Sequence, residues 1–460
     1  MSRNDSTPDT DKANSHAVRL TSLDAFRGVV MLLLIPDVYG GFSFYQMARR
    51  FPEDTIWSFL ARPFTHVQWT GCSIWDLILP AFLFLVGVSM PYSRAARKRR
   101  GDSEAEIIGH AVLRAMALLM LGIFLQMPVQ TYFDFLWPTL LLVLGLPVPE
   151  KLAEILPADR AFAGRALRVL WWTVILCVCA AALVANFSRI EDFAPHDVLS
   201  QVGLGYVFAF LLVNRGRVAQ GLAAFSILTL CWLAFFLYPL PGAEFDLSKV
   251  GVMPGDEIFT GYFAHWNKNT NLAAALDAWF LNLFPRSQPF LFNGLGYQTL
   301  NFIPSIATMI FGVMTGEYLR SGRPKVPLRN GLLKAGVLGV LGGLLAGWLL
   351  CPIVKSIWTP SWTLFSAGWV LILLAICYSF IDVSGRNSWA LPFVVVGRNP
   401  ILLYVLALKY RWWILEAWRR AFGSATFAGY WEPLIEALAV GLTLWVIAFV
   451  LYRLRIFIRL

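Results

Sequence analysis

The sequence predicts an all-α membrane protein, a polytopic bundle of about 12 transmembrane helices within a range of roughly 10–12. Hydrophobic residues make up 58% of the 460 residues and charged residues only 14%, against about 25% charged in soluble domains. The apolar runs are about 17–22 residues long, the length of a helix that crosses a hydrocarbon core of ~30 Å. Many of the 19 Trp residues lie near the ends of these runs, as interfacial side chains do.

The apolar runs fix each span to within a few residues. The fourth run, which is flanked by Pro, is the weakest. We expect the fourth and fifth runs to form one hairpin, so both cross the membrane or neither does. The later helices have the same orientation whether or not this hairpin is present. The predicted spans are 24–44, 72–92, 107–127, 133–147, 167–186, 198–213, 218–239, 301–319, 334–351, 361–381, 391–409 and 434–453.

The net charge of +10 follows the membrane topology and does not indicate a nucleic-acid partner. Lys and Arg concentrate in alternate loops and in the C-terminal tail, and cytoplasmic loops are the ones enriched in these residues. Both termini are therefore expected to be cytoplasmic, with the lipid bilayer as the surrounding solvent. The cationic loops include Arg94, Arg97, Lys98, Arg99 and Arg100, then Arg320, Arg323, Lys325 and Arg329, and finally Arg453 and Arg455.

The chain divides into a polar tail and one transmembrane domain. Residues 1–19 have no apolar core or cleavage signal, and we expect a disordered cytoplasmic tail there. We expect residues 20–460 to form a single transmembrane domain, in which residues 133–192 are an extra helical hairpin. The segment 240–300 is too long for a plain connector, and we expect it to cap the outer side through short interfacial helices. It either forms a passive lid or contacts a substrate.

Ionisable residues at membrane depth are costly, so they are candidates for function. Asp24 and Arg27 lie three apart at the start of the first span, either as an anchoring ion pair or as part of an anion site. His66 precedes the second span and Asp76 lies about one turn inside it. The imidazole is either a structural residue or a general base or acyl carrier.

Two more polar groups interrupt apolar sequence. Lys355 lies in an aromatic, Pro-broken turn on the outer side, either as an interfacial anchor or as a ligand for an anionic group. Arg398 and Asn399 precede Pro400 inside a span, which indicates either a kink or a functional cavity. The six cysteines show no metal-binding spacing, and no metal is expected.

The motifs resemble one known family. SLDAFRG, then HVQWTGCSIWDL, and later DVLSQVGLGY, FIPSIATMIFGVMTGEYLR, KSIWTPSW and VVVGRNPILLYV occur in order over most of the chain. This series resembles the heparan-α-glucosaminide N-acetyltransferase-like branch of the transmembrane acyltransferases. The resemblance implies transfer of an acyl group, mostly acetyl, from cytoplasmic acyl-CoA to a sugar hydroxyl or amine on the outer side. It also implies a bacterial inner-membrane location, because the most similar members are bacterial.

The resemblance also suggests roles for individual residues. His66 matches the key histidine of H-x-x-W-x-G, Asp76 the supporting acid, and Trp69 the aromatic residue of the motif, which would line the cavity. Arg27, Arg398 and Asn399 would bind the acyl-CoA. Asp24, Asp37, Lys355 and His265 complete the predicted substrate cavity, with Asp37 standing where family members place Asn.

Other interpretations are left open by the sequence. A transporter or flippase would use the same intramembrane charges as a permeation path, although no internal repeat supports it. An inactive scaffold would keep the fold without catalysis. The acceptor, the acyl chain and the oligomeric state, with a homodimer among the alternatives, are not determined.

Overall fold

The structure, a computed structural model, describes residues 20–34, 43–126, 194–242 and 244–458, with isolated positions between 170 and 177. Over these residues it is helical, with one isolated β-bridge between Thr70 and Val354 and no extended strand. The predicted all-α class is confirmed. The tail 1–19, Asp37 and almost all of the hairpin 133–192 lie outside the described residues.

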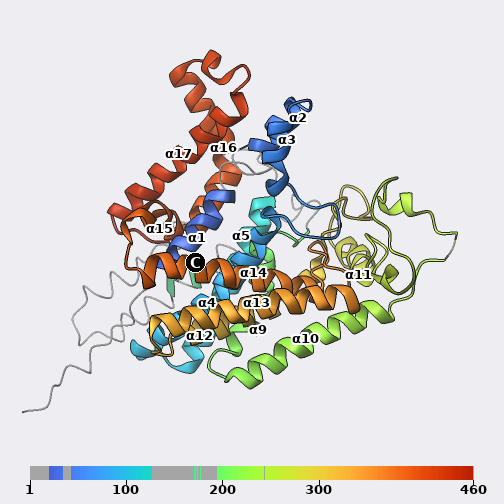
Figure 1. Cartoon of the computed structure of the whole chain (residues 1–460), viewed down its shortest axis with the longest axis horizontal. Coiled ribbons are helices and arrows are strands. Elements are labelled where there is room, and N and C mark those ends of the chain that lie inside the picture. The colour runs from blue at the N-terminus through green and yellow to red at the C-terminus, as the bar shows by residue number, and fades with distance from the viewer. Residues whose placement is uncertain are drawn as a thin grey trace, which may run out of the picture.

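Fourteen α-helices lie in the described ranges, and they include most of the predicted spans (Figure 1). They are α1 (Thr21–Leu34), α2 (Phe44–Arg50), α3 (Thr55–Ala61), α4 (Ile78–Arg99), α5 (Glu104–Gln126), α9 (Val198–Leu211), α10 (Arg217–Leu237), α11 (Leu272–Phe280), α12 (Phe302–Leu319), α13 (Lys325–Leu349), α14 (Pro360–Tyr378), α15 (Leu391–Gly397), α16 (Pro400–Phe422) and α17 (Glu432–Arg453).

Seven helices in the described residues are long and apolar enough to cross a membrane, or eight if one bent pair counts as a span. The seven match the predicted spans 72–92, 107–127, 218–239, 301–319, 334–351, 361–381 and 434–453. The bent pair, Ser388–Gly397 and Pro400–Phe422, coincides with the predicted span 391–409 and turns by 65° at its break.

Helix α9 is shorter than a full span. Asp197 caps its start by accepting hydrogen bonds from the amides of Leu199 and Ser200, and it has 14 residues, or about 21 Å at 1.5 Å per residue. The predicted span 198–213 is therefore a helix too short to cross a ~30 Å core on its own. It packs inside the bundle against α5 and α12.

Helix α4 forms the centre of the bundle and positions the site described below. It packs along α12, and the two backbones meet at Gly87 and Gly312. A Cβ atom at Gly87 would lie 2.1 Å from the carbonyl oxygen of Met309, so only glycine permits this approach. Small residues at helix crossings are the usual solution in membranes, where packing is what holds helices together.

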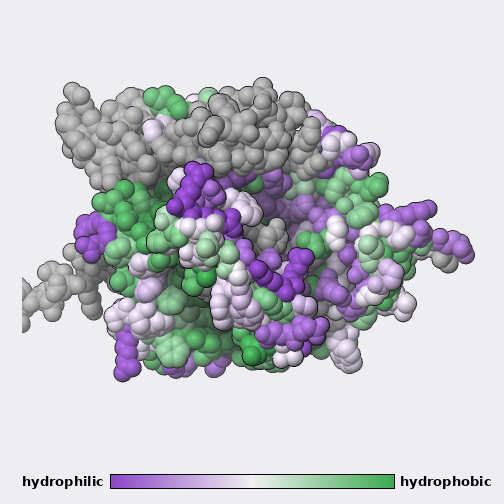
Figure 2. Space-filling model, turned by 90° about the horizontal axis from the view of Figure 1, so that it is seen from above, coloured by the Kyte–Doolittle hydropathy of each residue, from purple (hydrophilic) through white to green (hydrophobic). Residues whose placement is uncertain are grey.

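The apolar faces of the outer helices are exposed. Leu222 and Phe225 of α10, and Leu338 and Trp348 of α13, are among the most exposed large side chains. Figure 2 shows apolar residues interspersed with hydrophilic ones on the left and lower surface, and further hydrophilic residues at the centre and toward the right-hand end, where the segment 240–300 lies in Figure 1. This distribution fits helices surrounded by lipid.

The closest crossing described here joins α1 to α15. A Cβ atom on Gly397 would lie 1.8 Å from the carbonyl oxygen of Asp24, and one on Gly28 equally close to the carbonyl oxygen of Phe393. Both obstacles are backbone atoms, so neither can swing aside. The crossing also determines the positions of Asp24 and of the helix break that follows Gly397.

We expect Gly397→Ala to lower the free energy of unfolding by about 1–3 kcal/mol or more, the usual cost of overpacking. Thermal unfolding in detergent measures the loss. The matched control is Gly342→Ala on α13, where a new Cβ meets no atom within 4 Å. Equal melting temperatures for Gly397→Ala and the wild type would contradict the described crossing.

The segment 240–300 contains α11 and is stabilised by hydrogen bonds from its own asparagine side chains to its backbone. The Asn267 carboxamide pairs with both backbone groups of Phe259. Asn269 donates to the carbonyls of Val250 and Asn293, and Asn271 caps α11 through the amide of Ala274. These amides are therefore committed to the fold of the segment.

A buried carboxyl on α11 fixes the end of this segment, just before α12 begins. Asp277 on α11 accepts a hydrogen bond of 2.9 Å from the amide of Thr299, and it is fully buried. Burial raises the pKa of Asp277 from 3.8 to about 6, and the hydrogen bond from Thr299 opposes this shift.

The raised pKa of Asp277 predicts a pH dependence of stability. Between about pH 4 and pH 6 the folded protein holds a proton that the unfolded chain has lost, so this contribution is full below pH 4 and is lost as pH rises through 6. Asp277→Asn should therefore gain melting temperature relative to the wild type from pH 4 to 6 and level off above. A difference that is constant from pH 4 to 8 would refute the assignment.

Candidate functional site

Two loops that are far apart in sequence meet at one end of α4. The amide of Gly71 donates to the carbonyl of Ile353, and Thr70 forms the isolated bridge with Val354. Gly71 has a φ of 104°, a conformation that favours glycine. This explains why the motif H-x-x-W-x-G has glycine at this position. The contact brings the loop that carries His66 against the turn that carries Lys355.

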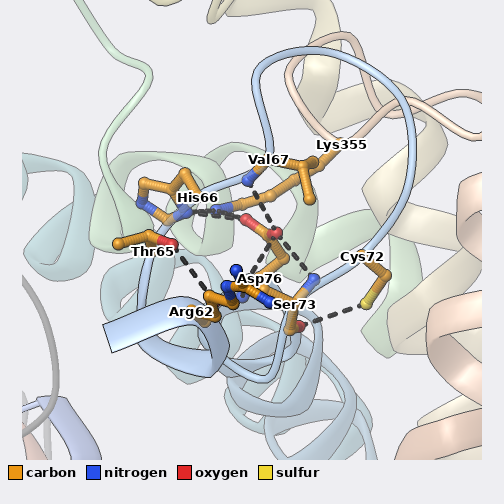
Figure 3. A network of polar contacts seen from close by, with 8 residues as sticks. All are labelled: Arg62, Thr65, His66, Val67, Cys72, Ser73, Asp76 and Lys355. Carbon is orange, nitrogen blue, oxygen red and sulfur yellow. Dashed lines mark hydrogen bonds and ion pairs between the residues drawn. The ribbon is translucent and has the colours of Figure 1, made fainter. Parts of the chain in front are cut away.

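His66, Asp76 and Lys355 form a connected cluster (Figure 3). His66 Nδ1 lies 2.6 Å from Asp76 Oδ1, and Lys355 Nζ donates to the same oxygen at 3.1 Å. Lys355 Nζ also lies 3.1 Å from His66 Nδ1. His66 and Lys355 therefore converge on one carboxylate oxygen from two separate loops.

The second oxygen of Asp76 is held by the loop before α4. Asp76 Oδ2 accepts hydrogen bonds from the amide of Ser73 at 3.0 Å, from the Ser73 hydroxyl at 2.9 Å and from the amide of Val67 at 3.4 Å. The carboxylate is thus fixed in orientation, and its Oδ1 faces the imidazole. Such a carboxylate selects the tautomer of the histidine that it contacts.

A tight, buried turn presents Lys355. The amide of Trp358 donates to the carbonyl of Lys355, and the amide of Thr359 donates to that of Val354. Trp358 adopts a φ of 47°, a left-handed conformation that is costly for a large side chain. Its ring is buried and its Nε1 donates to Thr308 on α12. Packing against α12 therefore holds the lysine turn in a strained shape.

The cluster opens into a pocket of about 320 Å³, part of it open to solvent. Asp76 and Lys355 are almost completely buried, with 1% and 7% of their side chains exposed, whereas 42% of the His66 side chain is exposed. Among the described residues, His66 Nε2 has no hydrogen-bond partner, so this nitrogen is available to a substrate. The lining residues are His66, Val67, Gln68, Trp69, Asp76, Leu295, Tyr297, Lys355 and Ser356.

A cysteine beside the cluster is not a competing nucleophile. Cys72 lies before α4, and its thiol donates to the carbonyl of Ser73. Burial raises the pKa of Cys72 to about 12, helped by the charge of Asp76 and opposed by that of Lys355. Thiolate is the reactive form of cysteine, so Cys72 is inert near neutral pH.

A second polar cluster joins α1, α4 and the break between α15 and α16. Arg27 donates to Asp24 at 3.0 Å and to the Ser89 hydroxyl at 2.6 Å, and Arg398 lies 3.5 Å from the same aspartate. Ser89 lies about 20 Å further along α4 than Asp76, at a rise of 1.5 Å per residue. The predicted anion-binding arginines are therefore brought together, on the side opposite to His66.

The segment after α17 covers this second cluster. Asn399 donates to the carbonyl of Ile456 and accepts from the amide of Ile458, so both ends of its carboxamide bind the tail. Arg398 stacks on the ring of Phe457, with 4.7 Å between the guanidinium carbon and the ring centre. Contact of Asn399 with a cofactor would require these residues to move away.

The remaining predicted site residues lie apart from the reactive cluster or support it. Trp69 is buried at the pocket wall and its Nε1 donates to the carbonyl of Trp266. His265 lies in the segment 240–300, with its Nδ1 3.0 Å from the carbonyl oxygen of Tyr238 and its ring against Phe236. The structure therefore does not bring His265 to His66.

Sequence reasoning missed one residue that holds Asp76 and two residues of the pocket lining. Ser73, three residues before Asp76, carries the spacing of a helix-capping residue and was a detectable signal. Gln68 and Tyr297 line the pocket without any motif that points to them. No group of three or more His, Cys, Asp or Glu residues able to hold a metal occurs within the described ranges.

No protein-family model matches the chain. It is 25% identical to the heparan-alpha-glucosaminide N-acetyltransferase of Mus musculus and 24% identical to that of Homo sapiens, over 98% of the chain in both cases. The matched region is 61% of each relative, so the chain spans about three-fifths of their length. Along nearly all of its length the chain is similar to these N-acetyltransferases, and the family resemblance indicated by its motifs is confirmed.

Proposed function

We propose that the chain is a membrane-embedded acyltransferase that moves an acetyl group from cytoplasmic acetyl-CoA to a sugar hydroxyl or amine on the outer side. The main observation that supports this proposal is the His66–Asp76–Lys355 cluster. It has a free imidazole nitrogen at a pocket and a fixed carboxylate behind the imidazole. Similarity to N-acetyltransferases supports acetyl as the group that is transferred.

His66 carries the chemistry in this proposal. The acceptor oxygen or nitrogen attacks the acetyl carbonyl carbon, the bond from that carbon to sulfur breaks, and the acceptor proton passes to His66 Nε2. In a two-step version, Nε2 first takes the acetyl group from the thioester and then yields it to the acceptor. Asp76 holds the proton of Nδ1 in both versions and stabilises the imidazolium that forms.

Lys355 balances the charge of Asp76 and faces the developing negative charge. Its ammonium group lies 3.1 Å from both His66 Nδ1 and Asp76 Oδ1. With Asp76 ionised, Lys355 protonated and His66 neutral, the cluster carries no net charge before reaction. A fixed cation beside the reacting carbonyl stabilises an oxyanion more effectively in a water-poor pocket than in bulk solvent.

The second cluster would meet the phosphates of acetyl-CoA on the predicted inner side. Arg27 and Arg398 share one carboxylate, Asp24, so the three side chains have a net positive charge. Arginines bind phosphate through charge-assisted, often bidentate, hydrogen bonds. The separation of about 20 Å along α4 between Ser89 and Asp76 suits an elongated cosubstrate that has its phosphates at one end and its thioester at the other.

We expect Arg27→Gln to raise the KM for acetyl-CoA at least about tenfold, the value of one hydrogen bond to a charged group. The kcat with saturating acetyl-CoA should change little, since Arg27 does not contact the reacting atoms. Arg420→Gln is the control, because Arg420 forms an exposed pair with Glu416. An unchanged KM in a folded Arg27→Gln variant would remove Arg27 from the cosubstrate site.

The broken helix favours one competing function. Helices α15 and α16 bend by 65° at Arg398 and Asn399, and transporters often bind their cargo at such discontinuous helices. A transporter would move a solute without consuming acetyl-CoA. Binding and turnover of acetyl-CoA therefore separate the two proposals.

The purified protein tests this proposal directly. Labelled acetyl-CoA is supplied with envelope glycans, and both bound label and label on the glycan are measured. We expect saturable binding and His66-dependent transfer. Absence of acetyl-CoA binding would overturn the acyltransferase proposal and favour transport.

A further inference from the structure

Arg114 is an arginine within a membrane helix that has no counterion in the described part of the chain. It lies about ten residues after the start of α5, or about 15 Å along the helix at 1.5 Å per residue. Its Nε is buried and has no hydrogen-bond partner among the described residues. The guanidinium carbon lies 5.4 Å from the centre of the Tyr206 ring on α9. A charged side chain at this depth is costly, so Arg114 is a candidate for ligand binding.

The acids closest to Arg114 in sequence bind other groups. Three acids lie in the turn between α4 and α5 and at the start of α5, and they form the pairs Asp102–Arg97, Glu104–Arg94 and Glu106–Ser103. His110 lies one turn before Arg114, and the charges of Arg97, Arg100 and Arg114 act on it together. Positive charge therefore extends from the predicted inner end of α5 to Arg114, where an anion would complete the charge balance.

Arg114 faces the interior of the bundle. Val112 and Met116 lie two residues to either side of it, which is more than half a helical turn away, and they are 38% and 40% exposed. Ile107 and Leu121 lie seven residues to either side, which is about two turns, so they share the face of Arg114, and both are buried. A lipid headgroup would meet the opposite face of α5. The ligand of Arg114 is therefore expected between the helices.

Arg114 lies at about the depth of the second polar cluster. Ser89 precedes the end of α4 by about ten residues, and Arg114 follows the start of α5 by about as many, so each lies about 15 Å from the turn that joins the two helices. Helix α16 begins just after Arg398 and contacts both α1 and α5. The Arg27–Arg398 cluster and Arg114 are thus two positively charged groups at a similar depth, on helices that share α16 as a neighbour.

The proposed cosubstrate has phosphate in two separate places. The diphosphate of acetyl-CoA leads to the arm that ends in the thioester, and the 3′-phosphate branches from the ribose. Arginine binds phosphate through charge-assisted hydrogen bonds, and a guanidinium has five N–H donors for them. Two arginines suit the diphosphate, and a single arginine at a similar depth suits the branch.

We propose that Arg114 binds the 3′-phosphate of acetyl-CoA, while Arg27 and Arg398 bind the diphosphate. The inference rests on the proposed acyltransferase function and names a specificity residue for its cosubstrate. The ring of Tyr206 lies under the guanidinium and holds it in place between α5 and α9. Arg114 then selects acetyl-CoA over a thioester that lacks the 3′-phosphate.

Equilibrium binding to the purified protein tests the proposal without an acceptor. The Kd is measured for labelled acetyl-CoA and for labelled acetyl-3′-dephospho-CoA. We expect the wild type to bind acetyl-CoA at least about tenfold more tightly, the value of one hydrogen bond to a charged group. Arg114→Gln should weaken the binding of acetyl-CoA alone, so that this preference is lost. Arg27→Gln should weaken the binding of both thioesters equally and keep the preference.

The matched control is another arginine that lies over a tyrosine. Arg217 is exposed at the start of α10, and its guanidinium carbon lies 5.7 Å from the centre of the Tyr318 ring. Arg217→Gln should change neither Kd. Thermal unfolding without ligand separates binding from folding, because Arg114→Gln removes no ion pair of the described residues and should melt close to the wild type. Arg114→Lys keeps the charge and should keep part of the preference.

The outcomes separate this inference from the function on which it rests. Equal Kd values of the wild type for the two thioesters, or equal weakening of both by Arg114→Gln, would overturn the role of Arg114 and leave the acyltransferase standing. Absence of binding of either thioester would overturn both. If phosphatidylglycerol raised the melting temperature only when Arg114 is present, and Arg114→Gln kept the preference for acetyl-CoA, the site would belong to a lipid headgroup.

Discussion

Replacement of His66 by alanine is expected to reduce acetyl transfer by about 10³-fold, within the range that a general base or acid contributes. The imidazole is the group in the pocket with a free basic nitrogen among the described residues, and Cys72 is held as a thiol by its raised pKa. Among the other described side chains that line the pocket, Asp76 is already engaged by Lys355, Ser73 and Val67, and Lys355 is paired with it. The rate of label transfer from acetyl-CoA at saturating acceptor measures the effect.

The matched control is a second histidine on the same predicted side. His265→Ala removes an imidazole that contacts the carbonyl of Tyr238 and lies outside the lining of the pocket. It should keep most of the transfer rate. Equal losses in the two variants would indicate that both act through folding, and a fully active His66→Ala protein would refute the role of His66.

The second large effect is expected at the buried ion pair. Asp76→Asn leaves Lys355 as a buried cation without its counterion and removes the acceptor that fixes the His66 tautomer. Removal of one partner of a buried pair costs about 3–5 kcal/mol of stability. Transfer should fall by at least about 10²-fold, as when the carboxylate behind a catalytic histidine is neutralised.

A double variant separates stability from chemistry. Asp76→Asn with Lys355→Met removes both charges, so most of the lost stability should return while transfer stays low. Lys268→Met is the control, since its pair with Asp256 is partly exposed and should contribute no more than about 1 kcal/mol. Thermal unfolding and transfer rates are measured on the same samples. Recovery of transfer in the double variant would show that the carboxylate is dispensable.

Much of the fold follows from simple patterns in the sequence. Apolar runs of membrane length predicted the spans that the described residues contain, because lipid forces the backbone into helices. The alternation of loops placed His66, Lys355 and the segment 240–300 on one side, and the pocket lined by His66, Lys355 and Tyr297 agrees with this.

Tertiary contacts could not be read in the same way. Lys355 was a candidate by residue type, but its 3.1 Å contact with Asp76 depends on the bridge between Thr70 and Val354 and on the strained Trp358 turn. Asn399 looked available to a cofactor, yet its carboxamide binds the segment after α17. Such pairings depend on distant backbone groups, which carry no local signal.

In the proposed reaction, acetyl enters at the Arg27 cluster and leaves at His66, across the membrane. Sealed vesicles with the predicted inner face outward receive labelled acetyl-CoA outside and enclose glucosamine. We expect label on the enclosed sugar, CoA released outside, and loss of transfer in His66→Ala. Label found on acceptor only when it is supplied on the same side as acetyl-CoA would contradict it.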